Sequence, residues 1–420
     1  MLKKILFSLY AAFFVVHTLY AAPFGYVTNF QSANSTVIDA ATNTVVTTIT
    51  VGGFPYGLAV TPDGKFVYVC AGQVVVIDTS TNMVVDSIPV GVDPLFVAFT
   101  PDGKFAYVVN ARSHTVSVIN TSMRSVIATI PVGGEGNGIA ITPNGNFAYV
   151  VNSDINNVAV IDTSLNTVVD TVDVGNGPVQ ITMTPTGFAY VANNGDGTVS
   201  VINTSINSVV ATVPVGGAPF DLTCTPDGSF VYVTNEADAT VSVINTSNNT
   251  VTDLITLPVG SEPWGIACTP DGKFAYVVYN ALNEVGIINL STNTVLPTTI
   301  PCGTSPLFIA FTPLPSSPTL IPPFQFRGKI VQRQGTFQLK TFWAPSPTSN
   351  VIAYEIYKGK KLIATVSSSD SNNFTIPIPK PQKGVHHWYK KFVRSLEKKY
   401  KIRAVNSQFA RSDFVFLDVQ

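Results

Sequence analysis

The chain has 420 residues, and its 24 Lys and Arg nearly balance 25 Asp and Glu, for a formal net charge of −1. Such a total argues against a protein that binds nucleic acid or another polyanion over its whole surface. With 45% hydrophobic and 12% charged residues, the chain can bury substantial cores, so disorder throughout is excluded.

Residues 1–22 have the layout of a secretory signal peptide. Lys3 and Lys4 precede an apolar run over 5–20, and Ala21 and Ala22 supply small residues for cleavage. An uncleaved anchor is the alternative, because the run approaches the length of a membrane-spanning segment. We expect cleavage and export, which places the protein in the periplasm, at the cell surface or outside the cell.

A Phe-x-Tyr-Val unit recurs along residues 23–313 with a period of about 42 residues, and Thr-Pro pairs recur in step with it. Short alternating strands at this period predict a β-propeller with one four-stranded blade per repeat. We therefore predict an all-β fold, a seven-bladed β-propeller. The tyrosines of the unit are Tyr26, Tyr68, Tyr107, Tyr149, Tyr190, Tyr232 and Tyr276.

The strand order also predicts how the ring closes. The chain enters at 24–26, which matches the second strand of the repeat, and the last unit stops at 307–312, which matches the first. The closing blade is expected to combine 307–312 with three strands from 24–51, which removes free sheet edges. For the third repeat we assign 138–142, 147–151, 115–120 and 125–132 to one blade, from the inner to the outer strand.

The strings at 26–29 and 232–235 both read Tyr-Val-Thr-Asn, and Val-Ile-Asp-Thr and Thr-Pro-Asp-Gly strings accompany them. These repeats resemble the YVTN family of β-propellers. The resemblance implies the propeller fold over about residues 24–313. It leaves function open, because similar repeats occur in exported bacterial binding proteins, archaeal surface-layer proteins and the propellers of some redox enzymes and lyases.

A Pro-rich linker is expected at 314–323, followed by a second domain over 324–420. Segments 337–343, 353–357, 361–366, 373–378, 400–405 and 414–419 have the composition of strands, enough for a small β-sandwich. Trp343 in an early strand and Tyr400 in a late one resemble the core positions of a fibronectin type III domain. We therefore expect a C-terminal fibronectin type III-like β-sandwich.

Within that domain, residues 385–399 form an unusual basic segment. On a helix, its aromatic residues would make one apolar face flanked by cations. The face either packs on the sandwich, with solvated lysines, or contacts an anionic surface or polymer. The cations that would make this contact are Lys390, Lys391, Arg394, Lys398 and Lys399.

Groups for redox or metal chemistry are scarce. After residue 22 the only histidines are His114, His386 and His387, too few for a copper cluster, haem ligation or a Ser-His-Asp centre in the propeller. We therefore expect no cofactor and no metal site. The cysteines, which are Cys70, Cys224, Cys268 and Cys302, are expected to be buried free thiols, with a disulfide as the alternative.

The loops that enter the inner strands are the expected recognition face of the propeller. Apolar and aromatic side chains there either form a binding crown or fill the channel mouth as core. Glu135 and Asp221 add acidity and are the catalytic residues of an enzymatic alternative. The crown consists of Tyr56, Leu95, Phe96, Phe220, Trp264 and Phe308.

The leading functional hypothesis is an exported, non-enzymatic binding or scaffold protein that holds a protein or envelope ligand on the propeller loop face. The alternatives are a metal-assisted lyase or lactonase, and anionic-polymer binding through the C-terminal domain. Charge separates the two domains. Residues 23–313 have 20 acidic against five basic residues, whereas 314–420 have 17 basic against five acidic. The acidic balance explains the solubility of a propeller with few charges.

Overall fold

A computed structural model describes residues 23–314 fully and, beyond them, the backbone of strands between 326 and 419. The expected signal peptide, most of the linker and the basic segment with Lys390, Lys391, Arg394, Lys398 and Lys399 lie outside the described residues. The chain divides at residue 314 into two units, which are described separately. In the part of the chain that is described, no helix has the length and hydropathy to cross a membrane.

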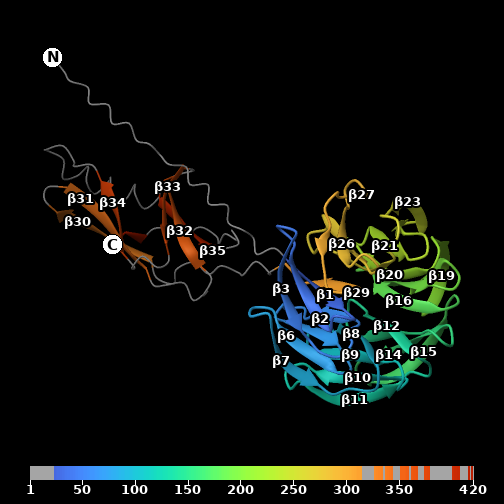
Figure 1. Cartoon of the computed structure of the whole chain (residues 1–420). Helices are drawn as coiled ribbons and strands as arrows, with labels where there is room; N and C mark the ends of the chain where they lie inside the picture. Colours follow the sequence, from blue (N-terminus) through green and yellow to red (C-terminus); the bar gives the residue numbers. More distant parts are fainter. Residues whose placement is uncertain are drawn as a thin grey trace. The chain divides into compact units, whose positions relative to one another are not determined.

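Residues 23–314 form seven antiparallel sheets arranged as the blades of a ring (Figure 1). In each blade the strands run in chain order from the inner to the outer strand, except in the closing blade. The first four sheets are β29 (Pro306–Phe311), β1 (Phe24–Asn29), β2 (Asn34–Asp39) and β3 (Thr44–Thr50); β4 (Leu58–Val60), β5 (Phe66–Cys70), β6 (Val74–Asp78) and β7 (Met83–Ile88); β8 (Pro94–Phe99), β9 (Phe105–Asn110), β10 (Thr115–Asn120) and β11 (Ser125–Pro131); and β12 (Gly136–Ile141), β13 (Phe147–Asn152), β14 (Asn157–Asp162) and β15 (Thr167–Asp173).

The other three sheets follow the same plan. They are β16 (Pro178–Met183), β17 (Phe188–Asn193), β18 (Thr198–Asn203) and β19 (Ser208–Pro214); β20 (Pro219–Cys224), β21 (Phe230–Asn235), β22 (Thr240–Asn245) and β23 (Thr250–Thr256); and β24 (Pro263–Cys268), β25 (Phe274–Tyr279), β26 (Glu284–Asn289) and β27 (Thr294–Val295), with β28 (Ile300–Pro301) also pairing with β26. The prediction of an all-β, seven-bladed propeller is confirmed.

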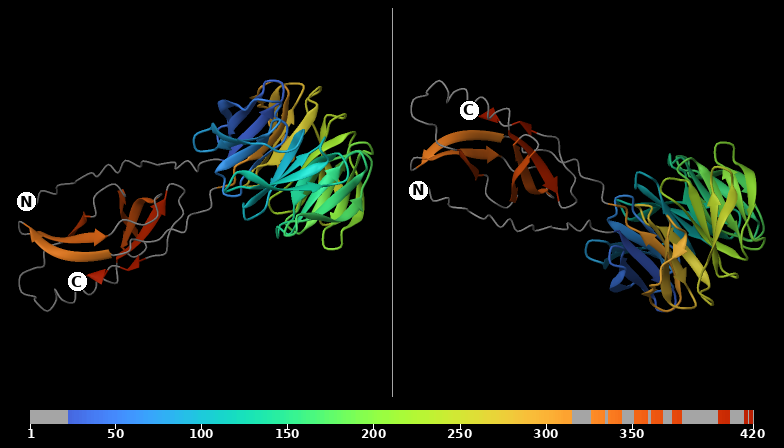
Figure 2. Two further views of the ribbon diagram at one scale, coloured as in Figure 1. Left: turned by 90° about the horizontal axis from the view of Figure 1, so that it is seen from below. Right: turned by 90° about the horizontal axis from the view of Figure 1, so that it is seen from above.

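The closing blade joins both ends of the propeller segment. Strand β29 pairs with β1, with Tyr26 opposite Ala310 and Gly25 opposite Phe311. The views in Figure 2 agree, since the blue strands of the first residues lie beside the orange strand near residue 310. The assignment of 115–120 and 125–132 to one blade with 138–142 and 147–151 is wrong. Strands β10 and β11 belong to the sheet of β9 and β8, in which β10 pairs with β9 and β11. Each connection from an outer to an inner strand crosses to the next blade.

The repeated tyrosines lock neighbouring blades together. All seven are at most 1% exposed, and in six blades the hydroxyl donates a hydrogen bond to an asparagine in the turn before the outer strand of the next blade. Tyr26 donates to Asn82 over 2.6 Å, for example. Arg124 occupies the corresponding turn position for Tyr68, and its guanidinium lies over the Phe66 ring. Each bond joins two neighbouring sheets, from the second strand of one to the turn before the outer strand of the other.

The Thr-Pro-Asp-Gly turns have a structural explanation. Thr61 donates to the Asp63 carboxylate over 2.7 Å, the Lys65 N–H donates to the same carboxylate, and Gly64 adopts a φ of 74°. Positive φ favours glycine, and the carboxylate replaces the missing partners of the turn. The same arrangement recurs in the other Thr-Pro-Asp-Gly turns, so these aspartates serve the fold.

The C-terminal unit contains two four-stranded sheets. Seven of the eight described strands correspond to the six predicted segments, since β36 and β37 both lie in 414–419, and β30 lies ahead of the first segment. The sheets are β34 (Asn373–Ile378), β31 (Thr336–Trp343), β30 (Phe326–Arg333) and β37 (Asp418–Val419); and β33 (Lys361–Ser367), β32 (Val351–Lys358), β35 (Tyr400–Asn406) and β36 (Val415–Phe416).

Candidate functional site

The candidate site lies at the end of the propeller where inner strands begin. At this end the chain enters β4, β20 and β24, and the turn from β21 to β22 lies at the same end. The inner strands of neighbouring blades lie close together around the ring axis, so side chains from five different blades meet here. We call this end the loop face.

The predicted crown residues pack on one another at the loop face. Phe308 contacts Tyr56 and Phe96, with ring centroids 5.4 and 4.7 Å apart, and Phe220 stacks against Trp264 at 4.3 Å. Phe220 also lies 6.1 Å from Phe308, which connects the two groups. Phe96 and Phe308 are buried, whereas the others, with Leu95, are half-buried. The crown therefore fills the channel mouth and leaves an aromatic wall at the surface.

Asp221 is the carboxylate that the structure embeds most deeply in this wall. Its Oδ2 accepts a hydrogen bond of 2.9 Å from the N–H of Ile266 on the neighbouring blade. The Leu222 N–H donates to the same carboxyl group. Burial raises the pKa of Asp221 to about 7, because the two backbone donors only partly replace the lost water. At neutral pH this group therefore exists in both protonation states.

Thr234 positions Asp221 and Trp264 relative to each other. Its hydroxyl accepts from the Asp221 N–H over 3.0 Å and donates to the Trp264 carbonyl over 2.7 Å. Only one other blade has Thr at this repeat position, Thr28, and that residue makes the same kind of bridge to the Tyr56 carbonyl over 2.6 Å. The two Tyr-Val-Thr-Asn strings thus fix the backbone on both sides of the aromatic wall.

Glu236 completes the site and was missed by the sequence analysis. The Trp264 indole N–H donates to Glu236 Oε1 over 3.3 Å, and burial, with a smaller contribution from Glu262, raises the pKa of the Glu236 carboxyl. Burial together with Glu236 and Asp221 raises the pKa of Tyr56 to about 12. Glu236 is the only acidic residue at its repeat position, directly after the Asn of the second strand, and that was the available signal.

Glu135 does not share these interactions. It is exposed, its N–H donates to the Asp154 carboxylate over 2.7 Å, and its carbonyl accepts from the Ser153 hydroxyl. The partners of Asp221 are Thr234 and Ile266 on other strands. The structure therefore supplies Glu236, rather than Glu135, as the second carboxyl group beside Asp221. Among residues 23–314 and the described strands beyond, no three or more His, Cys, Asp or Glu side chains are grouped as metal ligands would be.

Two pockets lie at the opposite end of the ring, between neighbouring blades. The larger has a volume of about 300 Å³ and is lined by the turns at 225–227 and 270–272. The other is lined by the equivalent turns at 61–63 and 102–103. Both form where one Thr-Pro-Asp-Gly turn meets the next, so they follow from the repeat. The four cysteines are free thiols, as expected, but only Cys70 is buried; the expectation of burial is wrong for Cys224, Cys268 and Cys302, which are half-buried.

Comparison with known proteins finds similarity to a lactonase family over part of the propeller and to several solved propeller structures. The family model described as Lactonase, 7-bladed beta-propeller, matches residues 58–208. Hydrazine synthase of Kuenenia stuttgartiensis is 25% identical, covers 60% of this chain and 88% of its own, and superposes with a TM-score of 0.55. A functionally unknown protein from Desulfotomaculum acetoxidans is 24% identical, with coverage of 70% and 99% and a TM-score of 0.62.

A protein of Bacteroides uniformis that is proposed to be a 6-phosphogluconolactonase is 17% identical, with coverage of 69% and 99% and a TM-score of 0.59. A search of the curated proteins found no match. The lactonase match overturns the expectation of a non-enzymatic binding or scaffold protein, and with it the expectation that the chain is not an enzyme. The comparisons favour the enzymatic alternative. The repeats did not indicate an enzyme, because a propeller fold does not determine which chemistry its loops perform.

Proposed function

We propose that this propeller hydrolyses a lactone, a cyclic carboxylic ester, at the loop face. The observation that carries the proposal is the pair of carboxyl groups, Asp221 and Glu236, held beside a half-buried aromatic wall. The Lactonase family match over residues 58–208 supports the same reaction class. An aromatic wall suits the apolar face of a lactone ring, and the two carboxyl groups can serve as base and acid.

Glu236 is the proposed general base. It is half-buried and is oriented by the Trp264 indole N–H, so its carboxylate can take a proton from a water molecule as that water attacks the lactone carbonyl. The raised pKa makes this carboxylate a better proton acceptor than one in water. Tyr56, whose hydroxyl stays protonated with a pKa of about 12, can donate a hydrogen bond to the oxygen on which negative charge develops.

Asp221 is the proposed general acid. With a pKa of about 7, it retains its proton over a range in which ordinary aspartates are ionised. As the ring C–O bond breaks, Asp221 gives this proton to the alkoxide, and the product is the open hydroxy acid. The attacking water supplies the hydroxyl of the new carboxyl group. The proton that this water gave to Glu236 passes through solvent to Asp221, so both carboxyl groups return to their starting states. Two carboxyl groups with different surroundings thus take different roles.

The test is hydrolysis of γ-butyrolactone and glucono-δ-lactone by the full chain. The rate is measured as the amount of base that must be added to hold the pH constant. We expect turnover by the wild type and a loss of at least about a hundredfold in Glu236→Gln, the usual scale for a general base. Asp196→Asn is the control, because Asp196 is an acidic residue of the same loop face that caps a turn at Asn176. Equal rates in Glu236→Gln and wild type would refute the assignment of the base.

We also infer the finer identities of the flanking regions. The repeats support a YVTN-type propeller, and the two sheets after residue 326 support a fibronectin type III-like domain over 324–420. The sequence of residues 1–22 supports export by a cleaved signal. N-terminal sequencing of the protein expressed in a bacterium tests export. A mature chain that begins near residue 22 or 23 is expected, and a retained Met1 in the cytoplasm would contradict it.

A further inference from the structure

The charge around the candidate site is one-sided. Residues 23–314 contain only five Lys and Arg, and each is paired with an aspartate: Lys65 with Asp63, Lys104 with Asp102, Arg112 with Asp93, Arg124 with Asp86 and Lys273 with Asp271. Four of these lie in turns at the end opposite the loop face. Arg112, in the turn from β9 to β10, lies at the loop face but in the third blade. Within the described propeller, no basic side chain at the loop face belongs to the blades that carry Asp221, Glu236 or Trp264. Lys273, in the blade of Trp264, lies in the turn from β24 to β25 at the opposite end.

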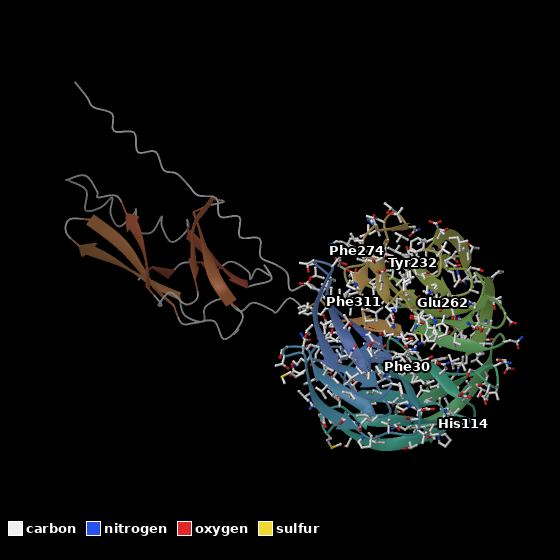
Figure 3. All side chains as sticks on the ribbon, viewed as in Figure 1. Phe30, His114, Tyr232, Glu262, Phe274 and Phe311 are labelled. Carbon is white, nitrogen blue, oxygen red and sulfur yellow. The ribbon has the colours of Figure 1, made fainter. Side chains whose placement is uncertain are left out.

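A second acid stands beside Glu236 without a cationic partner in the described propeller. Glu262 is exposed and lies two residues before Trp264, and its charge contributes to the raised pKa of Glu236. The connection that carries Glu262 has six residues, 257–262, between β23 and β24, against four, 215–218, between β19 and β20. Figure 3 shows Glu262 over the inner part of the ring, in contrast to His114 near its edge. Glu262 directly precedes β24, the inner strand that carries Trp264, in the position that Ala218 occupies before β20, and it therefore adds a carboxylate at the edge of the aromatic wall.

The aromatic wall next to these acids also favours a positive charge. Trp264 and Phe220 stack at 4.3 Å and remain half-buried, and the indole N–H is already used by Glu236. The ring faces carry negative potential, which attracts organic cations, and tryptophan is the strongest such group. Carboxylates beside an aromatic face therefore attract an ammonium group and repel a phosphate.

We propose that the substrate is a lactone that bears a positively charged amino group, which Glu262 binds at the edge of the Trp264–Phe220 wall while the ring lies against it. This inference rests on the proposed lactone hydrolysis and specifies its substrate class. It also separates this chain from a relative that would act on a phosphorylated lactone. A phosphate would meet Glu236 and Glu262, and the blades of these residues have no cation at the loop face, within the described propeller, to receive it. Glu262 then determines specificity, whereas Glu236 and Asp221 carry the reaction.

The binding test avoids turnover by using lactams, which share the ring but resist hydrolysis. Protonated α-amino-γ-butyrolactam and neutral γ-butyrolactam are titrated into the full chain, and affinity is measured by calorimetry. We expect the cationic lactam to bind roughly fivefold more tightly, the effect of one exposed charge pair. Glu262→Gln should remove that preference, and Glu284→Gln, an acid of the same blade, should keep it. Equal affinities of the wild type for the two lactams would overturn the inference.

A kinetic test separates this inference from the proposed function. Protonated α-amino-γ-butyrolactone, its neutral N-acetyl derivative and phosphorylated gluconolactone are compared by kcat/KM, with Glu262→Lys as the charge reversal. We expect the order cationic, neutral, anionic, and its reversal in the variant. Hydrolysis of all three without this order refutes the substrate class and leaves the lactonase proposal standing. Cation-selective lactam binding without any hydrolysis refutes the lactonase proposal and leaves the cation site standing.

Discussion

The unusual protonation of Asp221 predicts a specific pH dependence of folding stability. Burial raises the pKa of Asp221 from 3.8 to about 7 in the folded chain. The folded state therefore keeps a proton that the unfolded state releases, and wild-type stability falls as pH rises between these two values. One pKa unit corresponds to about 1.4 kcal/mol, so the penalty grows to about 4 kcal/mol between roughly pH 4 and pH 8. Asp221→Asn keeps the shape of the side chain and cannot ionise.

The variant should therefore become more stable relative to wild type as pH rises, by up to about 4 kcal/mol over that range. Guanidinium unfolding of both proteins at about pH 4 and pH 8 measures the difference. Asp102→Asn is the control of opposite sign, because hydrogen bonds from Lys104 and Thr100 hold the pKa of Asp102 down at about 2. That variant should lose stability relative to wild type as pH rises from about 2 to about 4, so it is compared with wild type at these two pH values, and it should change little between pH 4 and pH 8. A stability difference for Asp221→Asn that is independent of pH would refute the buried, proton-retaining carboxyl group.

Two further predictions concern the blade contacts that hold the site. Tyr149→Phe removes the hydroxyl that donates to Asn207 on the next blade and should lower the free energy of unfolding by about 1 kcal/mol. Tyr68→Phe should cost clearly less, because Arg124 stands where the other blades have the asparagine partner. Equal losses in denaturant titrations would contradict the role of the bond. Gly265→Ala places a Cβ 2.7 Å from the Cα of Phe308, and this backbone clash should lower the free energy of unfolding by about 1–3 kcal/mol. Calorimetry should therefore give a lower melting temperature. An unchanged melting temperature would show that the inner strands can move apart at no cost.

The propeller could be predicted from the sequence because its information is repeated. The Phe-x-Tyr-Val unit marks the second strand of every blade, and its tyrosines are buried in all seven. The unit also explains why one assignment failed, since the repeat that is easiest to recognise in the sequence spans two blades. Strands 115–120 and 136–141 are close in the chain but belong to different sheets. The outer strand between them is the last strand of its sheet, and the chain then enters the next blade. Period alone does not say where one blade stops.

The candidate site could be predicted only in part, because it is built from the departures from the repeat. Asp221 is recognisable as such a departure, where other blades have Gly, Phe or Gln. Glu236 is equally unusual at its position, but its relation to Asp221 depends on contacts across blades that spacing does not encode. Thr234 bonds to the backbone of Asp221, which is 13 residues away, and to that of Trp264, which is 30 residues away. Choosing between Glu135 and Glu236 therefore required the packing of the inner strands.

The most direct test of the account is the pH profile of kcat/KM for lactone hydrolysis by wild type and Asp221→Asn. Glu236 must be ionised and Asp221 protonated, so wild-type activity should rise as Glu236 loses its proton and fall again above about pH 7. In Asp221→Asn the rate should be lower, and the fall on the alkaline side should disappear because the group that causes it is gone. Absence of lactone hydrolysis at every pH, or an unchanged alkaline fall in the variant, would contradict the account.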